Sequence, residues 1–253
     1  MQAHQLAHHI EQIYSQHFLQ FPPFRMEHGQ VVGRFFKYRL MSVFHPVVSL
    51  TDHEVIGWRA VLRCVSQDEQ LVEPLRLFAL AFDNSGLVNL DRLVRTLHVL
   101  NALHQGLDGG LFLDVHPRLL GVVKDEHGRF FERVLQQFGL TPERIVIHLP
   151  SGTPGDAVLL AKAIANYRQR GYRVATSADL SALERLAHFD EASRPELATL
   201  TLADSVPLEL VDWRRQASAA GVATVAWHVE LPAQRDAIER AEFDYATGHT
   251  LVD

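Results

Sequence analysis

The chain is short of cysteine, with Cys64 alone among 253 residues. One cysteine excludes an intramolecular disulfide framework and a CxxC metal motif, and it suits a reducing compartment. No run of 18 apolar residues occurs, so we predict no membrane span. The first residues, MQAHQLAHHI, lack the basic and apolar regions of a signal peptide. We therefore predict a cytoplasmic protein.

A surplus of positive charge is also missing. The chain has 24 Lys and Arg against 30 Asp and Glu, a formal net charge of −6. This balance argues against nucleic acid as a partner, because broad electrostatic binding to phosphate backbones needs a basic surface. The hydrophobic share of 47% and the charged share of 21% are those of an ordinary globular protein.

The N-terminal part differs in pattern from the rest. Residues 3–19 place apolar side chains at helical spacing, and Pro22-Pro23 must end that helix. Its apolar stripe could pack on the rest of the protein, bind a partner or form a homo-oligomer. We divide the chain into an N-terminal helix and lead-in, 1–39, and one domain, 40–253.

Beyond residue 40, short apolar strands are joined by helices. Two β-rich runs, 42–50 and 54–64, come first. Later strands are expected at 110–117, 144–150, 172–179, 197–204, 222–229 and 244–251. Helices are expected at 73–84, 88–105, 129–138, 157–171, 182–189, 208–221 and 233–243. About eight such units in about 250 residues predict an α/β protein with a TIM-type (β/α)8-like barrel. A Gly-rich fingerprint after the first strand is missing, which disfavours an open dinucleotide-binding sheet.

Polar side chains gather where the predicted strands end, which is where barrel sites form. They are His45, Arg59, Arg63, Asp114, His116, His148, Ser177, Asp179, Thr201, Trp227, His228, Thr247 and His249.

The ordered motifs of residues 40–253 resemble the EAL domain, the cyclic di-GMP phosphodiesterase family. The opening HPVVSL and GWRAVLRC resembles QPIVDL and GYEALLRW, and LFLDVHPRLL resembles LFINVSPRLL. RIVIHLP, LATLTLAD and GVATVAWHVELPAQ are similar to the family's IVLEITE, YLKID and GIKVVAEGVETEEQ segments. DYATGHTL resembles the closing DYVQGYLF. The resemblance implies a barrel of the EAL kind, here with an N-terminal helical extension.

The resemblance also implies that several active-site residues of the family are replaced in this sequence. Active members hold two divalent cations with carboxylates and an asparagine, beside a lysine, and the metals activate a water. The matching positions here are Arg59, Asp114, His148, Ser177, Ala178, Thr201, Trp227 and Thr247. Of these, Asp114 alone is a carboxylate, and the cationic Arg59 would repel a metal ion. We therefore predict no catalytic residue, no metal ligand and no cofactor.

Arg63 matches the family's phosphate-contacting arginine. An arginine fork suits phosphate oxygens, so we predict a nucleotide-binding set of Arg63, Arg59 and Asp114, with cyclic di-GMP as candidate ligand. The alternative is that Arg63 closes an ion pair at the barrel mouth. Trp227 is bulky enough to fill the pocket.

The sequence contains two other candidate sites. Asp114 and His116 are two apart on a predicted strand, and with His148 they could rebuild the metal site of a hydrolase. Residues 151–156, SGTPGD, precede a helix and could cradle a phosphate, although such a segment is more often a turn and cap. Residual phosphodiesterase activity is a further alternative.

The leading hypothesis is a catalytically inactive EAL-like bacterial signalling protein. It would act by binding a protein partner, with cyclic di-GMP as a candidate ligand. The resemblance implies a place in motility, adhesion or biofilm regulation, as for other inactive members.

Overall fold

The computed structural model describes residues 24–122, 129–151, 157–202 and 206–251. The predicted helix 3–19 lies outside the described residues, and so does nearly all of the 151–156 segment.

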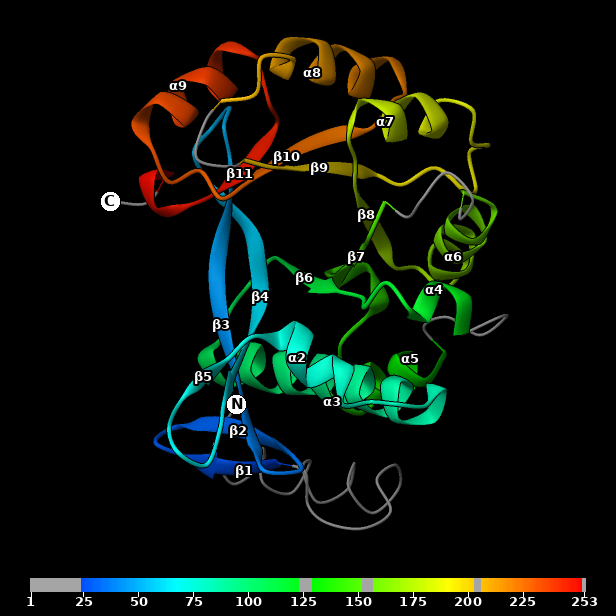
Figure 1. Ribbon diagram of the computed structural model, residues 1–253. Helices are drawn as coiled ribbons and strands as arrows, with labels where there is room; N and C mark the ends of the chain where they lie inside the picture. The colour runs from blue at the N-terminus through cyan, green and yellow to red at the C-terminus, as the bar shows by residue number, and fades with distance from the viewer. Residues whose placement is uncertain (1–23, 123–128, 152–156, 203–205, 252–253) are drawn as a thin grey trace.

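Eight strands close into a barrel at the centre of the molecule (Figure 1). They are β3 (Tyr38–Ser49), β4 (Val55–Val65), β6 (Gly110–Asp114), β7 (Ile145–Leu149), β8 (Arg173–Ser177), β9 (Leu197–Thr201), β10 (Ala223–Trp227) and β11 (Tyr245–Thr247). Strand β3 is antiparallel to both its neighbours, β4 and β11, and the other neighbouring pairs are parallel. The predicted α/β barrel is confirmed, and the short link at residues 51–53 between the two β-rich runs joins β3 and β4 as an antiparallel hairpin.

Helices follow the strands and cover the outside of the barrel (Figure 1). They are α2 (Pro74–Ala79), α3 (Asn84–Gln105), α4 (Leu119–Val122), α5 (Arg129–Gln137), α6 (Ala157–Gln169), α7 (Leu180–Leu186), α8 (Leu210–Ala219) and α9 (Pro232–Arg240), with 3-10 turns at Pro142–Arg144 and His249–Leu251. The long helix α3 begins at Asp83, whose carboxylate accepts the Gly86 N–H, and ends at the left-handed Gly106. No helix within the described ranges is both long and apolar enough to cross a membrane.

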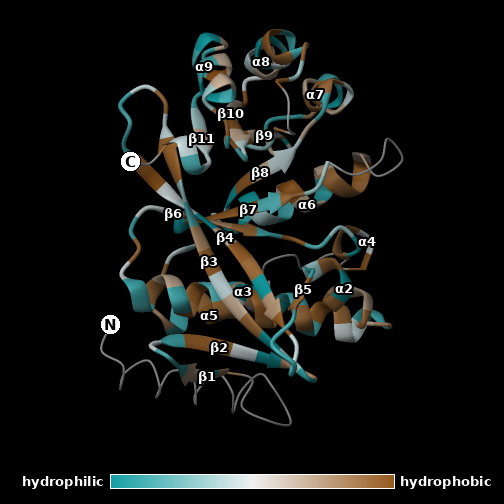
Figure 2. Cartoon of the chain, turned by 60° about the vertical axis from the view of Figure 1, so that its left-hand side comes forward, coloured by the Kyte–Doolittle hydropathy of each residue, from teal (hydrophilic) through white to brown (hydrophobic). Residues whose placement is uncertain are grey.

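The barrel interior is packed rather than hollow. Its core cluster consists of Val47, Phe112, Val146, Ala175, Leu197, Val225 and Trp227. Figure 2 shows brown, hydrophobic stretches along the barrel strands and mixed colours on the helices around them. Strands β4 and β6 approach so closely that a Cβ at Gly57 would lie 2.2 Å from the Gly110 carbonyl oxygen. A glycine is therefore required there.

Three short strands extend the sheet beyond the barrel, and the sequence did not predict them. Strands β1 (Phe24–Glu27) and β2 (Gln30–Phe35) form a hairpin that pairs with β3. Strand β5 (Leu71–Val72) pairs with β4. The sequence pattern of residues 24–35 predicts only a lead-in to the domain, without strands. The division at residues 39 and 40 stays a prediction, although β2 and β3 belong to one continuous sheet.

Candidate functional site

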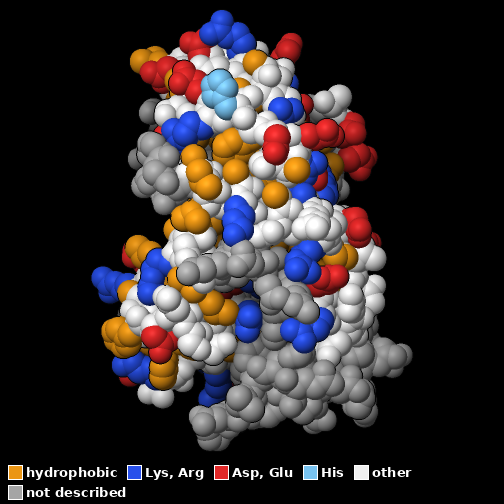
Figure 3. Space-filling model, turned by 90° about the vertical axis from the view of Figure 1, so that its right-hand side faces the viewer, with side chains coloured by type: hydrophobic (Ala, Val, Ile, Leu, Met, Phe, Trp, Pro, Cys, Tyr) orange, Lys and Arg blue, Asp and Glu red, His pale blue; other side chains and the backbone are white. Residues whose placement is uncertain are grey.

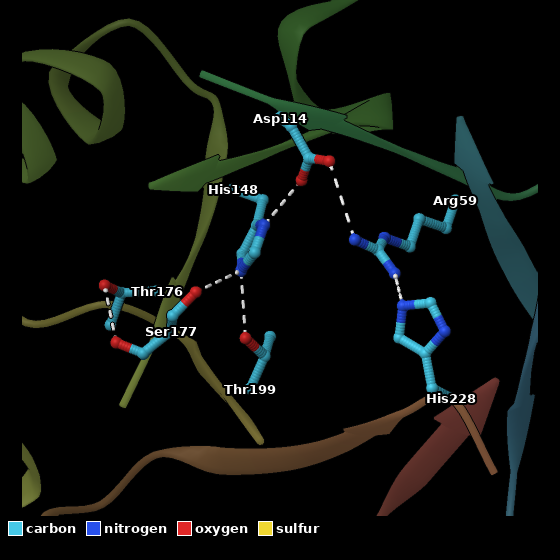
Figure 4. A network of polar contacts seen from close by, with 7 residues as sticks. All are labelled: Arg59, Asp114, His148, Thr176, Ser177, Thr199 and His228. Atoms are coloured by element: carbon cyan, nitrogen blue, oxygen red, sulfur yellow. Dashed lines mark hydrogen bonds and ion pairs between the residues drawn. The ribbon is translucent and has the colours of Figure 1, made fainter. Parts of the chain in front are cut away.

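A buried polar network lies at the end of the barrel where the parallel strands finish (Figure 4). It begins with Asp114, the last residue of β6, which pairs in register with His148 of β7. The Nδ1 atom of His148 lies 2.6 Å from Asp114 Oδ1. The guanidinium of Arg59 on β4 lies 3.6 Å from the other carboxylate oxygen. The network thus joins two of the predicted nucleotide-binding residues, Arg59 and Asp114, to His148.

The far side of His148 is also occupied. Its Nε2 lies 2.9 Å from Thr199 Oγ1 and 3.2 Å from Ser177 Oγ. In the neutral ring, Nδ1–H donates to the carboxylate and Nε2 accepts from the hydroxyls. Both ring nitrogens of His148 are therefore used within the protein.

Asp114 is held as a carboxylate by its neighbours. Burial raises the pKa of Asp114, but the hydrogen bond from His148 and the nearby Arg59 charge outweigh that effect, so the pKa lies below its usual value. Half of the side chain, 51%, remains exposed. Asp114 can accordingly still accept hydrogen bonds from a ligand.

Trp227 closes the barrel beneath this network. It is 1% exposed, and its ring packs edge-on to Phe112 and His148 at centroid distances of 5.6 and 5.8 Å. The guanidinium of Arg59 lies over the indole ring, 4.7 Å from its centroid. Trp227 and Arg59 therefore fill the space between β4, β6, β7 and β10.

Several histidines surround Arg59 at the mouth. His228 Nε2 lies 3.3 Å from Arg59 Nη1, and His228 has a left-handed backbone, with φ of 61°. The His45 ring lies 6.3 Å from that of His249, which bonds to Glu230. Burial, and then the charge of Arg59, lowers the pKa of both His45 and His228. Burial and the Arg59 charge thus favour the neutral form of His45 and His228.

Arg63 stands apart from the network. It lies on β4 four residues beyond Arg59, opposite Met41 of β3, and it is exposed. Among the described residues it makes no ion pair or hydrogen bond, so the alternative of an ion pair at the mouth is not observed. Its guanidinium is free to meet an anionic ligand.

In the network at the mouth, Asp114 supplies the carboxylate and its neighbours are not acidic. A guanidinium lies against Asp114, and the remaining side chains of the network are an imidazole and hydroxyls. In the part of the chain that the structure describes, no three His, Cys, Asp or Glu side chains are grouped to hold a metal ion. His116 does not join Asp114 and His148 as expected, because β6 ends at Asp114 and strand alternation ends with it. The His116 ring instead stacks on Phe78, with centroids 4.5 Å apart.

A pocket of about 240 Å³ opens beside the mouth. Its lining residues are Ala60, Val61, Leu62, Pro74, Leu75, Phe78, Val94, His98, Asp114, Val115, His116 and Pro117. Sequence reasoning missed His98, a polar residue in the middle of an apolar helical segment. A polar residue that interrupts an apolar helical segment was the sequence signal by which His98 could have been found.

Acidification should destabilise the fold through His98. Burial lowers the pKa of His98 to about 4, against 6.5 for an ordinary histidine. Between these values the unfolded chain binds a proton that the folded chain does not, so the free energy of unfolding falls as pH falls. The loss attributable to His98 should reach roughly 3 kcal/mol near pH 4. Urea titrations from pH 7 to pH 4, on wild type and His98→Gln, measure the difference. If the free energy of unfolding fell equally with pH in wild type and in His98→Gln, the prediction would be wrong.

The fold and the site together define a class of protein: a βα barrel with one reversed strand and a polar network at the ends of its parallel strands. A family model for the EAL domain matches residues 35–193, more than half of the chain. The chain belongs to the EAL domain family. A search of curated proteins found no match.

Solved structures share the fold at low sequence identity. The Bacillus subtilis YkuI protein, solved with cyclic di-GMP and calcium, is 20% identical with a TM-score of 0.68, over 85% of this chain and 55% of that chain. The FimX EAL domain of Pseudomonas aeruginosa bound to cyclic di-GMP is 17% identical, with a TM-score of 0.64 over 83% and 88% of the two chains. A standalone EAL protein of Vibrio cholerae in its cyclic di-GMP-bound form is 14% identical, with a TM-score of 0.63 over 85% and 91%. The present chain thus spans about half of YkuI and most of the other two.

Proposed function

We propose that this EAL domain binds cyclic di-GMP without hydrolysing it and passes the signal to a protein partner. The ion pair between Arg59 and Asp114 carries the proposal. A metal-dependent phosphodiesterase needs carboxylates free to hold cations, whereas here the mouth's carboxylate faces a guanidinium at 3.6 Å.

Positive side chains at the mouth supply what a phosphodiester needs. Arg63 is exposed and unpaired among the described residues, and Arg59 lies four residues away on the same face of β4. An arginine binds phosphate oxygens through two parallel hydrogen bonds without a metal. Similar folds have been solved with cyclic di-GMP bound, which supports the choice of ligand.

The proposal predicts metal-independent binding that depends on Arg63. Titration calorimetry of cyclic di-GMP into wild type in EDTA should show saturable binding, because the protein itself neutralises the phosphates. Arg63→Ala should weaken binding by about ten- to a hundredfold, the effect of losing a charge-assisted hydrogen bond. Arg215→Ala, which removes an exposed arginine on α8, is the matched control and should bind as wild type does.

The same sample tests inactivity. Incubated with cyclic di-GMP and Mg²⁺ or Mn²⁺, wild type should release no linear dinucleotide above a protein-free control, as followed by chromatography. Turnover with either metal would restore the phosphodiesterase alternative. Absence of binding in calorimetry and in a second equilibrium method would overturn the receptor proposal.

The surface offers apolar side chains for a partner. Figure 3 shows orange, hydrophobic side chains on the face turned to the viewer, among blue Lys or Arg and red Asp or Glu side chains. Leu208 is 98% exposed, and Val158 on α6 and Val211 on α8 are also largely exposed. Such residues are suited to contact another protein, and they support the partner part of the proposal.

A further inference from the structure

Asp114, His148 and Ser177 form a chain of two hydrogen bonds at the barrel mouth (Figure 4). His148 Nδ1 lies 2.6 Å from Asp114 Oδ1, and His148 Nε2 lies 3.2 Å from Ser177 Oγ. A hydroxyl beside an imidazole whose other nitrogen is held by a carboxylate is the arrangement that activates a serine nucleophile. The three residues come from β6, β7 and β8, so closure of the barrel brings them together.

The hydrogen positions in this chain suit the role of a base for His148. Asp114 is ionised beside Arg59, so its carboxylate accepts the hydrogen of His148 Nδ1. The neutral ring then has its lone pair on Nε2, which faces the Ser177 hydroxyl. His148 can therefore take the Ser177 proton. Asp114 is a positioning residue, which orients the ring and stabilises the charge that the ring gains.

A second hydroxyl competes for the same nitrogen. Thr199 Oγ1 lies 2.9 Å from His148 Nε2, closer than Ser177 Oγ, and Thr199 is 1% exposed. An imidazole nitrogen has one lone pair, so the two hydroxyls share it. Ser177 is only half-buried, and half of the Asp114 side chain is exposed, so a reactant in solvent can reach Ser177 but not Thr199.

We propose that Ser177 is a metal-independent nucleophile for carboxylic esters, with His148 as its general base. Ser177 Oγ attacks the carbonyl carbon, and its proton passes to His148 Nε2. The bond from the carbonyl carbon to the alcohol oxygen then breaks, and His148 returns the proton to that oxygen. A water, deprotonated by His148 in the same way, hydrolyses the acyl-serine, releases the carboxylic acid and restores Ser177.

The surroundings of Ser177 predict slow turnover. The N–H of the next residue, Ala178, donates to the Thr199 carbonyl oxygen and is therefore not free to stabilise an oxyanion. We expect a covalent adduct to be easier to detect than ester hydrolysis. The inference goes beyond the proposed function and does not depend on it, because the reaction needs neither a nucleotide nor a metal ion.

A fluorophosphonate probe tests the proposal, because it traps an activated serine as a phosphonyl ester, with fluoride leaving and the serine proton passing to the base. Wild type incubated with the probe in EDTA should gain the mass of one adduct, located at Ser177 by peptide mass spectrometry. Ser177→Ala should gain none. Ser181→Ala removes an exposed serine on α7 and is the matched control, which should be labelled as fast as wild type.

Two further variants test the role of His148. His148→Gln keeps a polar side chain but removes the base, so labelling should slow by about a hundredfold or more. Thr199→Val removes the competing hydroxyl and keeps the side-chain volume, so labelling should become at least about twofold faster. This second effect is a gain, which a loss of folding cannot imitate.

Three results would overturn the proposal. They are a wild type that is not labelled at Ser177, labelling that His148→Gln leaves unchanged, and labelling of Thr199→Val that is no faster than that of wild type. The last result would show that the two hydroxyls do not compete for His148. None of these results bears on the binding of cyclic di-GMP, so the inference and the proposed function are tested separately.

Discussion

Replacing Trp227 by alanine should lower the free energy of unfolding by about 3–5 kcal/mol. Trp227 is almost wholly buried in the barrel core, so its removal leaves a cavity that the rigid strands cannot close. The ring also supports Arg59 from below and packs against His148. The loss of unfolding free energy should therefore exceed the part that comes from the buried apolar area of Trp227 alone.

Urea denaturation of wild type, Trp227→Ala and Trp227→Phe measures this effect. Phenylalanine refills most of the cavity and keeps an aromatic face for Arg59, so it should recover at least half of the loss. If alanine cost less than about 1 kcal/mol, Trp227 would be a rim residue that tolerates truncation, and its assignment as the barrel's plug would be wrong.

Breaking the ion pair inside α3 should cost a similar amount. Asp91 and Arg95 lie one turn apart on the inner face of the helix, with side chains 3% and 9% exposed. The Arg95 guanidinium also lies 5.0 Å from the centroid of the Phe131 ring of α5. Arg95→Met leaves a buried carboxylate without its counter-charge, and we expect a loss of about 3–5 kcal/mol. Thermal or urea unfolding at pH 7 measures it.

A double variant separates charge from packing. Burial already raises the pKa of Asp91, and the carboxylate also accepts the backbone N–H of His116. Asp91→Asn keeps that acceptor and removes the charge, so Asp91→Asn/Arg95→Met should be more stable than Arg95→Met alone. Arg215→Met, which breaks an exposed pair with Asp212, should change stability by less than about 1 kcal/mol. A double variant less stable than the single one would show that Arg95 acts through packing.

The sequence predicted which residues lie at the mouth of the barrel, but it did not predict which of them are in contact. We identified three of its residues as strand ends, namely Arg59, Asp114 and His148, because the ends of near-continuous apolar strands can be recognised in the sequence. Thr199 was not identified, and the contact of Ser177 with His148 was not predicted, because both hydroxyls reach His148 only when β8 and β9 lie beside β7. Pairing between strands distant in sequence carries no local signal.

His98 and Asn101 show the same limit in the helices. Asn101 of helix α3 accepts a hydrogen bond from the Val31 N–H and donates one to the Val31 carbonyl oxygen. One buried amide therefore binds strand β2 to the helix. The hairpin β1–β2 was unexpected because its pairing with β3 depends on that distant helix. The expected position of His116 failed for a related reason, since the end of β6 decides where alternation stops.

The sequence by itself determined the barrel class and the order of the barrel's strands and helices, because hydrophobic periodicity is a local property of the chain. Only the tertiary structure decided that Arg59 pairs with Asp114, that Trp227 fills the barrel, and that His98 and Asp114 line one pocket. These depend on the closure of the barrel, which brings together side chains from strands and helices far apart along the chain.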